Sequence, residues 1–217
     1  MYKTVVFDLD GTLLNTLTDL ADAGNRLCRK YGWPTHERQA YRYFVGNGIP
    51  KLVERLAPAD QRTPAVLEAA LADFKRDYGQ HLRDTTAPYP GIPEMLAKLK
   101  ANGVQLVVFS NKADALAKEV VKDYFGTQYF TIVRGQMTGV APKPAAEGTN
   151  ALLQALHADP ASTLYVGDSN VDVETAHNAN LPCCGAVWGF RTREELNAAG
   201  AEYLAENSDE LYDVIMK

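Results

Sequence analysis

Short apolar runs rich in β-branched residues alternate with helical patterns along most of this 217-residue chain. Four runs stand out: Thr4 to Leu9, Val104 to Ser110, Thr163 to Gly167 and Gly185 to Trp188, with weaker candidates at 129–133 and 202–205. Runs that are apolar on both faces are typical of buried parallel strands. Helical patterns follow at 92–99, 113–124, 145–157 and 171–178. This alternation predicts an α/β fold with a doubly wound, Rossmann-type parallel sheet.

One insertion interrupts the alternation. About 90 residues separate the first two strands, which is too long for an ordinary crossover connection. Apolar residues recur at helical spacing from Leu17 to Tyr31, and residues 48–56 and 64–82 also have helical patterns. Thr16 and Asp19 have the spacing of a capping box. We therefore expect a core domain of residues 1–14 and 85–217 and an inserted helical domain of residues 15–84.

Charged and polar side chains gather where the predicted strands end. They are Asp8 and Asp10 after the first strand, Ser110, Asn111 and Lys112 after the second, Lys143 before a helix, and Asp168 and Asp172 after the strand at 163–167. In open parallel sheets, ligands bind beyond the carboxyl ends of the strands. The sequence therefore predicts one site built from these segments.

The residue types favour phosphoryl transfer. Asp8 and Asp10 share a face of the strand and repel by roughly 3 kcal/mol at about 5 Å, so a cation is expected between them. Oxygen ligands in this number suit Mg²⁺. One carboxylate can attack phosphorus and a second can transfer protons, while Ser110 and Lys143 hold phosphoryl oxygens. A single aspartate after a strand is usually a turn former or N-cap, and only the combination favours function.

The four motifs together resemble the haloacid dehalogenase (HAD) superfamily, and within it the phosphoglycolate phosphatase-like branch. The matching segments are Asp8-Leu9-Asp10-Gly11-Thr12, Ser110-Asn111-Lys112, Pro142-Lys143-Pro144 and Gly167-Asp168-Ser169-Asn170-Val171-Asp172. The resemblance implies a HAD-like core with the inserted helices as a mobile cap. It also implies Mg²⁺ and an aspartyl-phosphate intermediate in the hydrolysis of 2-phosphoglycolate or a similar small organic phosphate.

The resemblance assigns roles residue by residue. Asp8 is expected to be the nucleophile and Asp10 the general acid and base, with Ser110 and Lys143 binding the phosphoryl group. Metal ligands are expected at Asp8, the Asp10 backbone carbonyl and Asp168, with Asp172 binding directly or through water. Further phosphate or substrate contacts are expected at Gly11, Thr12, Asn111, Gly46, Asn47, Gly48 and Lys51.

Several alternatives remain open. A phosphosugar mutase resembling β-phosphoglucomutase would need a cap histidine shortly after the first motif, and residues 13–22 contain none. A phosphonoacetaldehyde hydrolase would use a cap lysine, for which Lys51 is the candidate. Residues 46–48 form either an anion-binding loop or a turn with an N-cap. A catalytically silent binding module should lack some of the motif residues, and all are present.

Composition limits the partners. The chain has 22 Lys and Arg against 27 Asp and Glu, a net charge of -5, which argues against nucleic-acid binding. No apolar stretch has the length of a membrane span and no signal peptide is evident, so we expect a cytoplasmic protein with a small phosphorylated metabolite as partner. The three cysteines have no zinc-type spacing. The sequence leaves monomer and homodimer open.

Overall fold

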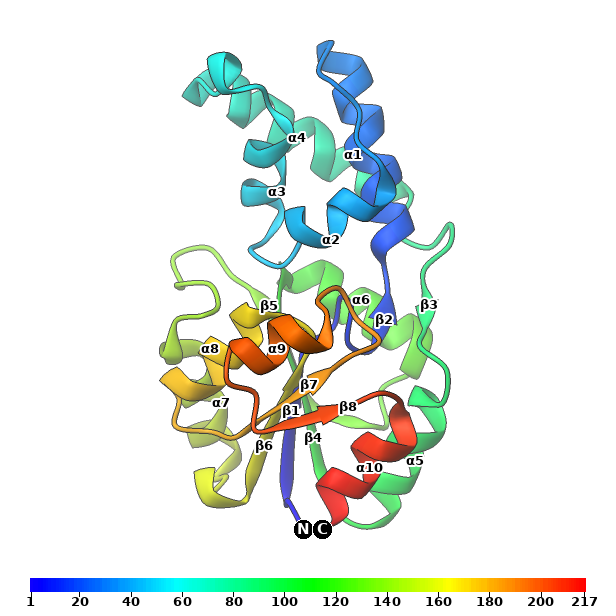
Figure 1. Ribbon diagram of the computed structural model, residues 1–217, viewed down its shortest axis with the longest axis vertical. Coiled ribbons are helices and arrows are strands. Elements are labelled where there is room, and N and C mark those ends of the chain that lie inside the picture. Colours follow the sequence, from blue (N-terminus) through cyan, green and yellow to red (C-terminus); the bar gives the residue numbers. More distant parts are fainter.

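The predicted strands lie side by side in one parallel sheet of six strands, in a computed structural model that describes residues 1–217 (Figure 1). The sheet order is β5-β4-β1-β6-β7-β8. The bounds are β1 Thr4–Phe7, β4 Gln105–Ala113, β5 Phe130–Gln136, β6 Thr163–Gly167, β7 Cys183–Ala186 and β8 Tyr203–Ala205. The predicted parallel α/β sheet is confirmed, with β1 at its centre between β4 and β6.

Alternate residues of the strands pack on opposite faces of the sheet. Val5 and Phe7 of β1 belong to a core shared with three helices, α5 (Ile92–Ala101), α6 (Asp114–Phe125) and α10 (Ser208–Met216). Val6 belongs to a second core with α7 (Ala146–Leu156), α8 (Asn170–Asn178) and α9 (Arg193–Ala198). This period-two alternation, with helices on both faces, is the doubly wound arrangement that the apolar runs predict.

The inserted helices gather at the end of the molecule opposite the two termini (Figure 1). They are α1 Leu17–Tyr31, α2 Tyr41–Phe44, α3 Ile49–Leu56 and α4 Pro64–Gln80, with short 3-10 turns at Arg38–Ala40 and Ala59–Gln61. The chain leaves the core through β2 (Leu14–Asn15) and returns through β3 (Ala87–Pro88), and these two short strands pair antiparallel. We call residues 15–84 the cap; this boundary remains a prediction.

The expected capping box at the start of α1 is wrong. The Thr16 side chain caps nothing, and its buried hydroxyl has no hydrogen-bond partner. The Asp19 carboxylate instead accepts four hydrogen bonds, from the backbone amides and the hydroxyls of Thr85 and Thr86. Asp19 therefore ties the first helix of the cap to the segment that returns to the core, because that segment offers it more donors than its own helix does.

No helix is long and apolar enough to cross a membrane. All three cysteines are buried free thiols.

Candidate active site

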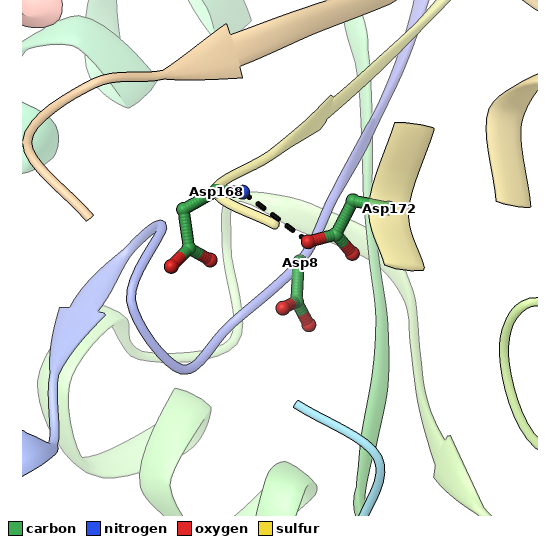
Figure 2. Close-up of side chains that lie close together, drawn as sticks. All are labelled: Asp8, Asp168 and Asp172. Atoms are coloured by element: carbon green, nitrogen blue, oxygen red, sulfur yellow. Dashed lines mark hydrogen bonds between the residues drawn. The ribbon is translucent and has the colours of Figure 1, made fainter. Parts of the chain in front are cut away.

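Three buried aspartates meet where β1 and β6 end (Figure 2). Asp8 directly follows β1, Asp168 follows β6, and Asp172 lies in the first turn of α8. One carboxylate oxygen of each lies within 4.8 Å of the others. The strand register causes this meeting, because Phe7 pairs with Val166 and the chains leave the sheet together.

Lys143 neutralises part of this negative charge. Its side chain is only 2% exposed, and its ammonium lies 2.9 Å from Asp8 Oδ1 and 2.7 Å from Asp172 Oδ1. Beyond this ion pair, Asp8 Oδ1 is buried and accepts no hydrogen bond. Burial alone would lower the pKa of Lys143, but Asp172 and Asp8 raise it well above its ordinary value. Lys143 is therefore a fixed cation beside Asp8.

Asp172 is occupied by donors from its own chain segment. Its Oδ2 accepts hydrogen bonds from the amides of Asp168 and Ser169 and from the Ser169 hydroxyl, while Oδ1 accepts one from Lys143 at 2.7 Å. Ser169 and Asp172 thus form a capping box for α8. With four donors already on its two oxygens, Asp172 is better placed to hold Lys143 and the Asp168 turn than to ligate an ion directly.

The carboxyl groups titrate abnormally because they are buried together. Burial outweighs the nearby Lys143 and, with Asp172, raises the pKa of Asp8 to about 7. Burial and the charges of Asp172 and Asp8 raise the pKa of Asp168 well above its ordinary value. Burial and the mutual repulsion of the carboxylates thus disfavour their charged forms.

Asp10 points to a different lysine. Lys112 Nζ donates to Asp10 at 3.0 Å and 3.4 Å from its two carboxylate oxygens. The same ammonium donates to the hydroxyl of Tyr78, on cap helix α4, at 2.8 Å. Burial alone would lower the pKa of Lys112, but Asp10 and Tyr78 raise it above its ordinary value. Asp10 is thus paired with a cation that also touches the cap.

A β-bulge at the end of β4 brings three consecutive residues to the site. Phe109 pairs with Arg134 and Ala113 with Gln136, so Ser110, Asn111 and Lys112 bulge out of the ladder. In a regular strand the middle side chain would point away, whereas all three line one cavity. Sequence periodicity does not reveal this irregularity.

Asn111 clamps two segments. Its amide nitrogen donates to the backbone oxygens of Gly46 (2.9 Å) and Lys143 (3.3 Å), and its carbonyl oxygen accepts from the Lys143 amide at 2.9 Å. Lys143 is therefore held in place by the strand that also supplies Ser110.

A cavity of about 40 Å³ lies between these polar residues of the core and the cap. Its core side is lined by Asp8, Asp10, Ser110, Asn111 and Lys112. Its cap side is lined by Leu20, Val45, Gly46, Gly48, Ile49, Leu52 and Tyr78. A water needs about 10–15 Å³ on this scale, so the space holds a few water molecules. The core side is polar and the cap side mostly apolar.

The predicted cap contacts divide into two groups. Gly46 and Gly48 line the cavity, whereas the Asn47 side chain accepts a hydrogen bond from Arg55 within the cap. Gly48 is the N-cap of α3 and has no side-chain cap, and anion binding by this loop stays a prediction. Lys51 is 47% exposed, pairs with Glu54 and does not line the cavity.

Gly11 and Thr12 support Asp168 rather than facing the cavity. Gly11 has φ +93°, and a Cβ there would lie 2.2 Å from Asp168 Oδ2, so this turn requires glycine. The Thr12 hydroxyl donates to Asp168 Oδ1 at 3.0 Å. Neither residue is among those lining the cavity, and their expected phosphate contacts stay predictions.

The donor set fits a Mg²⁺ ion. Asp8 has an oxygen without a hydrogen-bond donor, and each Asp168 oxygen accepts only one hydrogen bond, from Thr12 or from the Phe190 amide. Four carboxylates face two ammonium groups here, Lys112 and Lys143, which leaves two negative charges. Hard oxygen donors with a charge deficit of two suit a divalent hard cation.

Two arginines join the cap to the site and were not predicted. Arg42 of α2 donates to the carbonyls of Phe190 (2.8 Å) and Gly189 (2.5 Å). The buried Arg191 donates to the Arg42 carbonyl, and its guanidinium lies 4.9 Å from the centre of the Tyr43 ring. The Phe190 amide in turn donates to Asp168 at 2.7 Å. In the sequence only Arg191 lies beside Trp188-Gly189-Phe190, and Arg42 gives no signal of such a role.

Comparison with known proteins gives a consistent result. The sequence matches the model of a family described as haloacid dehalogenase-like hydrolase over residues 5–186. A phosphoglycolate phosphatase from Chromobacterium violaceum is 32% identical over 216 residues, 98% of this chain and 96% of that protein. One from Neisseria gonorrhoeae is 32% identical over 191 residues, 87% of this chain and 81% of that protein.

A solved structure is similar over the whole chain. It is a Lactobacillus delbrueckii subsp. bulgaricus protein provisionally named as a phosphoglycolate phosphatase, with a TM-score of 0.93 and 28% identity. The match covers 99% of this chain and 98% of that one.

Proposed function

The chain belongs to the haloacid dehalogenase-like hydrolase family, and from this premise we propose that it is a Mg²⁺-dependent phosphomonoesterase acting through an aspartyl phosphate on Asp8. The observation that carries the proposal is the buried group of Asp8, Asp168 and Lys143 at the carboxyl end of β1. Asp8 also lines a cavity together with Asp10 and Ser110. Its relatives named phosphoglycolate phosphatase support phosphatase activity.

Asp8 and Asp168 would hold the ion through their side chains, together with the Asp10 backbone carbonyl. When bound, Mg²⁺ would neutralise charge on the phosphoryl oxygens and on these carboxylates. Asp172 would act through Lys143, or on the ion through water.

The chain's own residues would then share the reaction. Lys143 and Ser110 would hold phosphoryl oxygens while an Asp8 oxygen attacks phosphorus. The bond from phosphorus to the leaving oxygen breaks as Asp10, which enters this step protonated, gives that oxygen its proton. Asp10 then takes a proton from the water that attacks phosphorus, so Asp8 is released and inorganic phosphate leaves.

The cavity favours a compact substrate, and we propose 2-phosphoglycolate or a similarly small organic phosphate. The space is about 40 Å³, and four of its cap residues are Leu20, Val45, Ile49 and Leu52. A sugar hydroxyl buried against these side chains without a hydrogen-bond partner would weaken the binding free energy by about 1–3 kcal/mol. Lys51 is exposed and lies outside the cavity, which gives no support to a phosphonoacetaldehyde hydrolase. No histidine lines the cavity, which gives no support to a phosphosugar mutase.

A phosphate-release screen tests the proposal. Purified protein is assayed with phosphoglycolate, sugar phosphates, nucleotides and pyrophosphate, with Mg²⁺ and with EDTA. We expect Mg²⁺-dependent release with the highest kcat/KM for the smallest monoesters. Sugar-phosphate interconversion with little phosphate release, or no release from any compound, would contradict it.

A further inference from the structure

Lys112 is a buried cation that none of the steps above uses. Its side chain is 2% exposed, and burying an ammonium is costly unless it is paired. Its two partners lie on different parts of the molecule, Asp10 in the core and Tyr78 on cap helix α4.

Lys112 alone holds the Asp10 side chain. No other group in the chain donates a hydrogen bond to this carboxylate, which is 14% exposed and lines the cavity. Tyr78, in contrast, is firmly placed: it is 1% exposed and packs against Phe74, with ring centres 5.6 Å apart. The cap therefore fixes one end of a chain of contacts that finishes at Asp10.

The core fixes the backbone of Lys112 as closely as the cap fixes its tip. The Lys112 amide donates to Ser110 Oγ at 3.2 Å. Across the edge of the sheet, a Cβ on Gly135 would lie 2.4 Å from the Lys112 carbonyl oxygen, so β4 and β5 are in close contact there. With both ends held, the ammonium has little freedom except through movement of the cap.

We propose that Lys112 and Tyr78 are positioning residues that make the orientation of the Asp10 carboxylate depend on the docked cap. When the cap is closed, the Tyr78 hydroxyl holds the ammonium and the ammonium holds the carboxylate toward the leaving oxygen. When the cap opens, Tyr78 leaves and Asp10 loses its defined direction. This inference rests on the proposed role of Asp10 as the group that protonates the leaving oxygen.

Two substrates of similar size separate this role from a general loss of structure. The alkoxide released from phosphoglycolate needs a proton during phosphoryl transfer, whereas the acetate released from acetyl phosphate does not. The value of kcat/KM reports the steps up to and including phosphoryl transfer. A misplaced Asp10 should therefore lower kcat/KM for phosphoglycolate but not for acetyl phosphate.

The variants are Lys112→Met and Tyr78→Phe, with Tyr31→Phe as the matched control. Tyr31 is a cap tyrosine whose hydroxyl donates to Asp73, within the cap. For Lys112→Met we expect kcat/KM to fall about 100-fold more on phosphoglycolate than on acetyl phosphate, because a positioned acid contributes about 10²–10⁴-fold. Tyr78→Phe, which removes one oxygen only, should show a smaller difference of the same sign, and Tyr31→Phe none.

The same measurement in an Asp10→Asn background tests whether Lys112 acts through Asp10. We expect Lys112→Met to cause no further loss there, because the group that it positions is gone. Equal losses on both substrates, or a full additional loss in the Asp10→Asn background, would overturn the inference and show that Lys112 supports the fold or binds substrate directly. If the wild type hydrolyses neither substrate, the proposed function itself fails.

Discussion

At the scale of single residues, the site is governed by a shortage of positive charge. Lys143 contacts both Asp8 and Asp172, and Lys112 contacts Asp10, while Asp168 has no cationic partner. Buried carboxylates packed this closely are easier to protonate than free ones. The folded protein without metal therefore binds protons that the unfolded chain releases.

This leads to a stability that depends on pH. The pKa of Asp8 is raised to about 7 by burial, so protonated Asp8 stabilises the fold at acid pH, and this contribution is lost as pH rises toward about 7. In EDTA, we expect Asp8→Asn to raise the melting temperature relative to wild type more at about pH 8 than at about pH 5. Thermal melts at the two pH values measure the difference.

The matched control for this prediction is Asp60→Asn, which changes an exposed carboxylate of the cap. Its effect on the melting temperature should be small at both pH values. A difference between Asp8→Asn and wild type that stays constant from acid to alkaline pH would show that Asp8 is not destabilised by its surroundings.

Much of the site follows from strand order. Asp8 and Asp168 directly follow β1 and β6, and Ser110 lies near the end of the neighbouring β4, so their meeting is predictable once those strands are recognised. The partners of Lys112 are not predictable in this way. They depend on a bulge in β4 and on a tyrosine 34 positions away in the cap.

At the scale of elements, capping motifs also depend on tertiary contacts that the sequence does not reveal. Thr192 and Glu195 form a capping box for α9, a helix absent from the predicted set, although the Thr-x-x-Glu spacing is visible in the sequence. Thr16 and Asp19 have equivalent spacing and form none. The difference is tertiary, because Thr85 and Thr86 supply four donors that draw Asp19 away from its own helix.

The contact between α2 and the loop after β7 gives an element-scale prediction. Arg42 is half-buried and donates to Gly189 and Phe190, next to the amide that holds Asp168. A hydrogen bond from a charged donor stabilises a contact by about 1.5–3 kcal/mol, and solvent replaces part of this when the side chain is removed. Because Arg42 holds the cap against the loop beside Asp168, we expect Arg42→Ala to raise KM about tenfold. Steady-state kinetics with phosphoglycolate measure this change.

Arg38→Ala is the control, because the Arg38 guanidinium donates only to Thr18, within the cap. Its KM should stay near the wild-type value. Unchanged kinetics in Arg42→Ala would mean that this contact does not hold the cap against the core.

At the scale of the whole molecule, the site exists only where two parts of the chain meet. The core supplies the charged wall of the cavity and the cap supplies the apolar wall. The sequence predicts the core wall from its motifs and the inserted helices from their periodicity. It does not predict how closely the two walls approach, because the contacts of Asn111, Lys112 and Arg42 join residues that are far apart in the chain.

In the proposed mechanism, Asp8 carries the phosphoryl group during turnover. The most direct measurement is to mix the protein with phosphoglycolate and Mg²⁺, quench rapidly in acid and locate the modification by peptide mass spectrometry. We expect a phosphorylated Asp8 in the wild type, and in Asp8→Asn a folded protein with neither modification nor phosphate release. Near-normal turnover by Asp8→Asn, or a phosphoryl group on another residue, would contradict the claim.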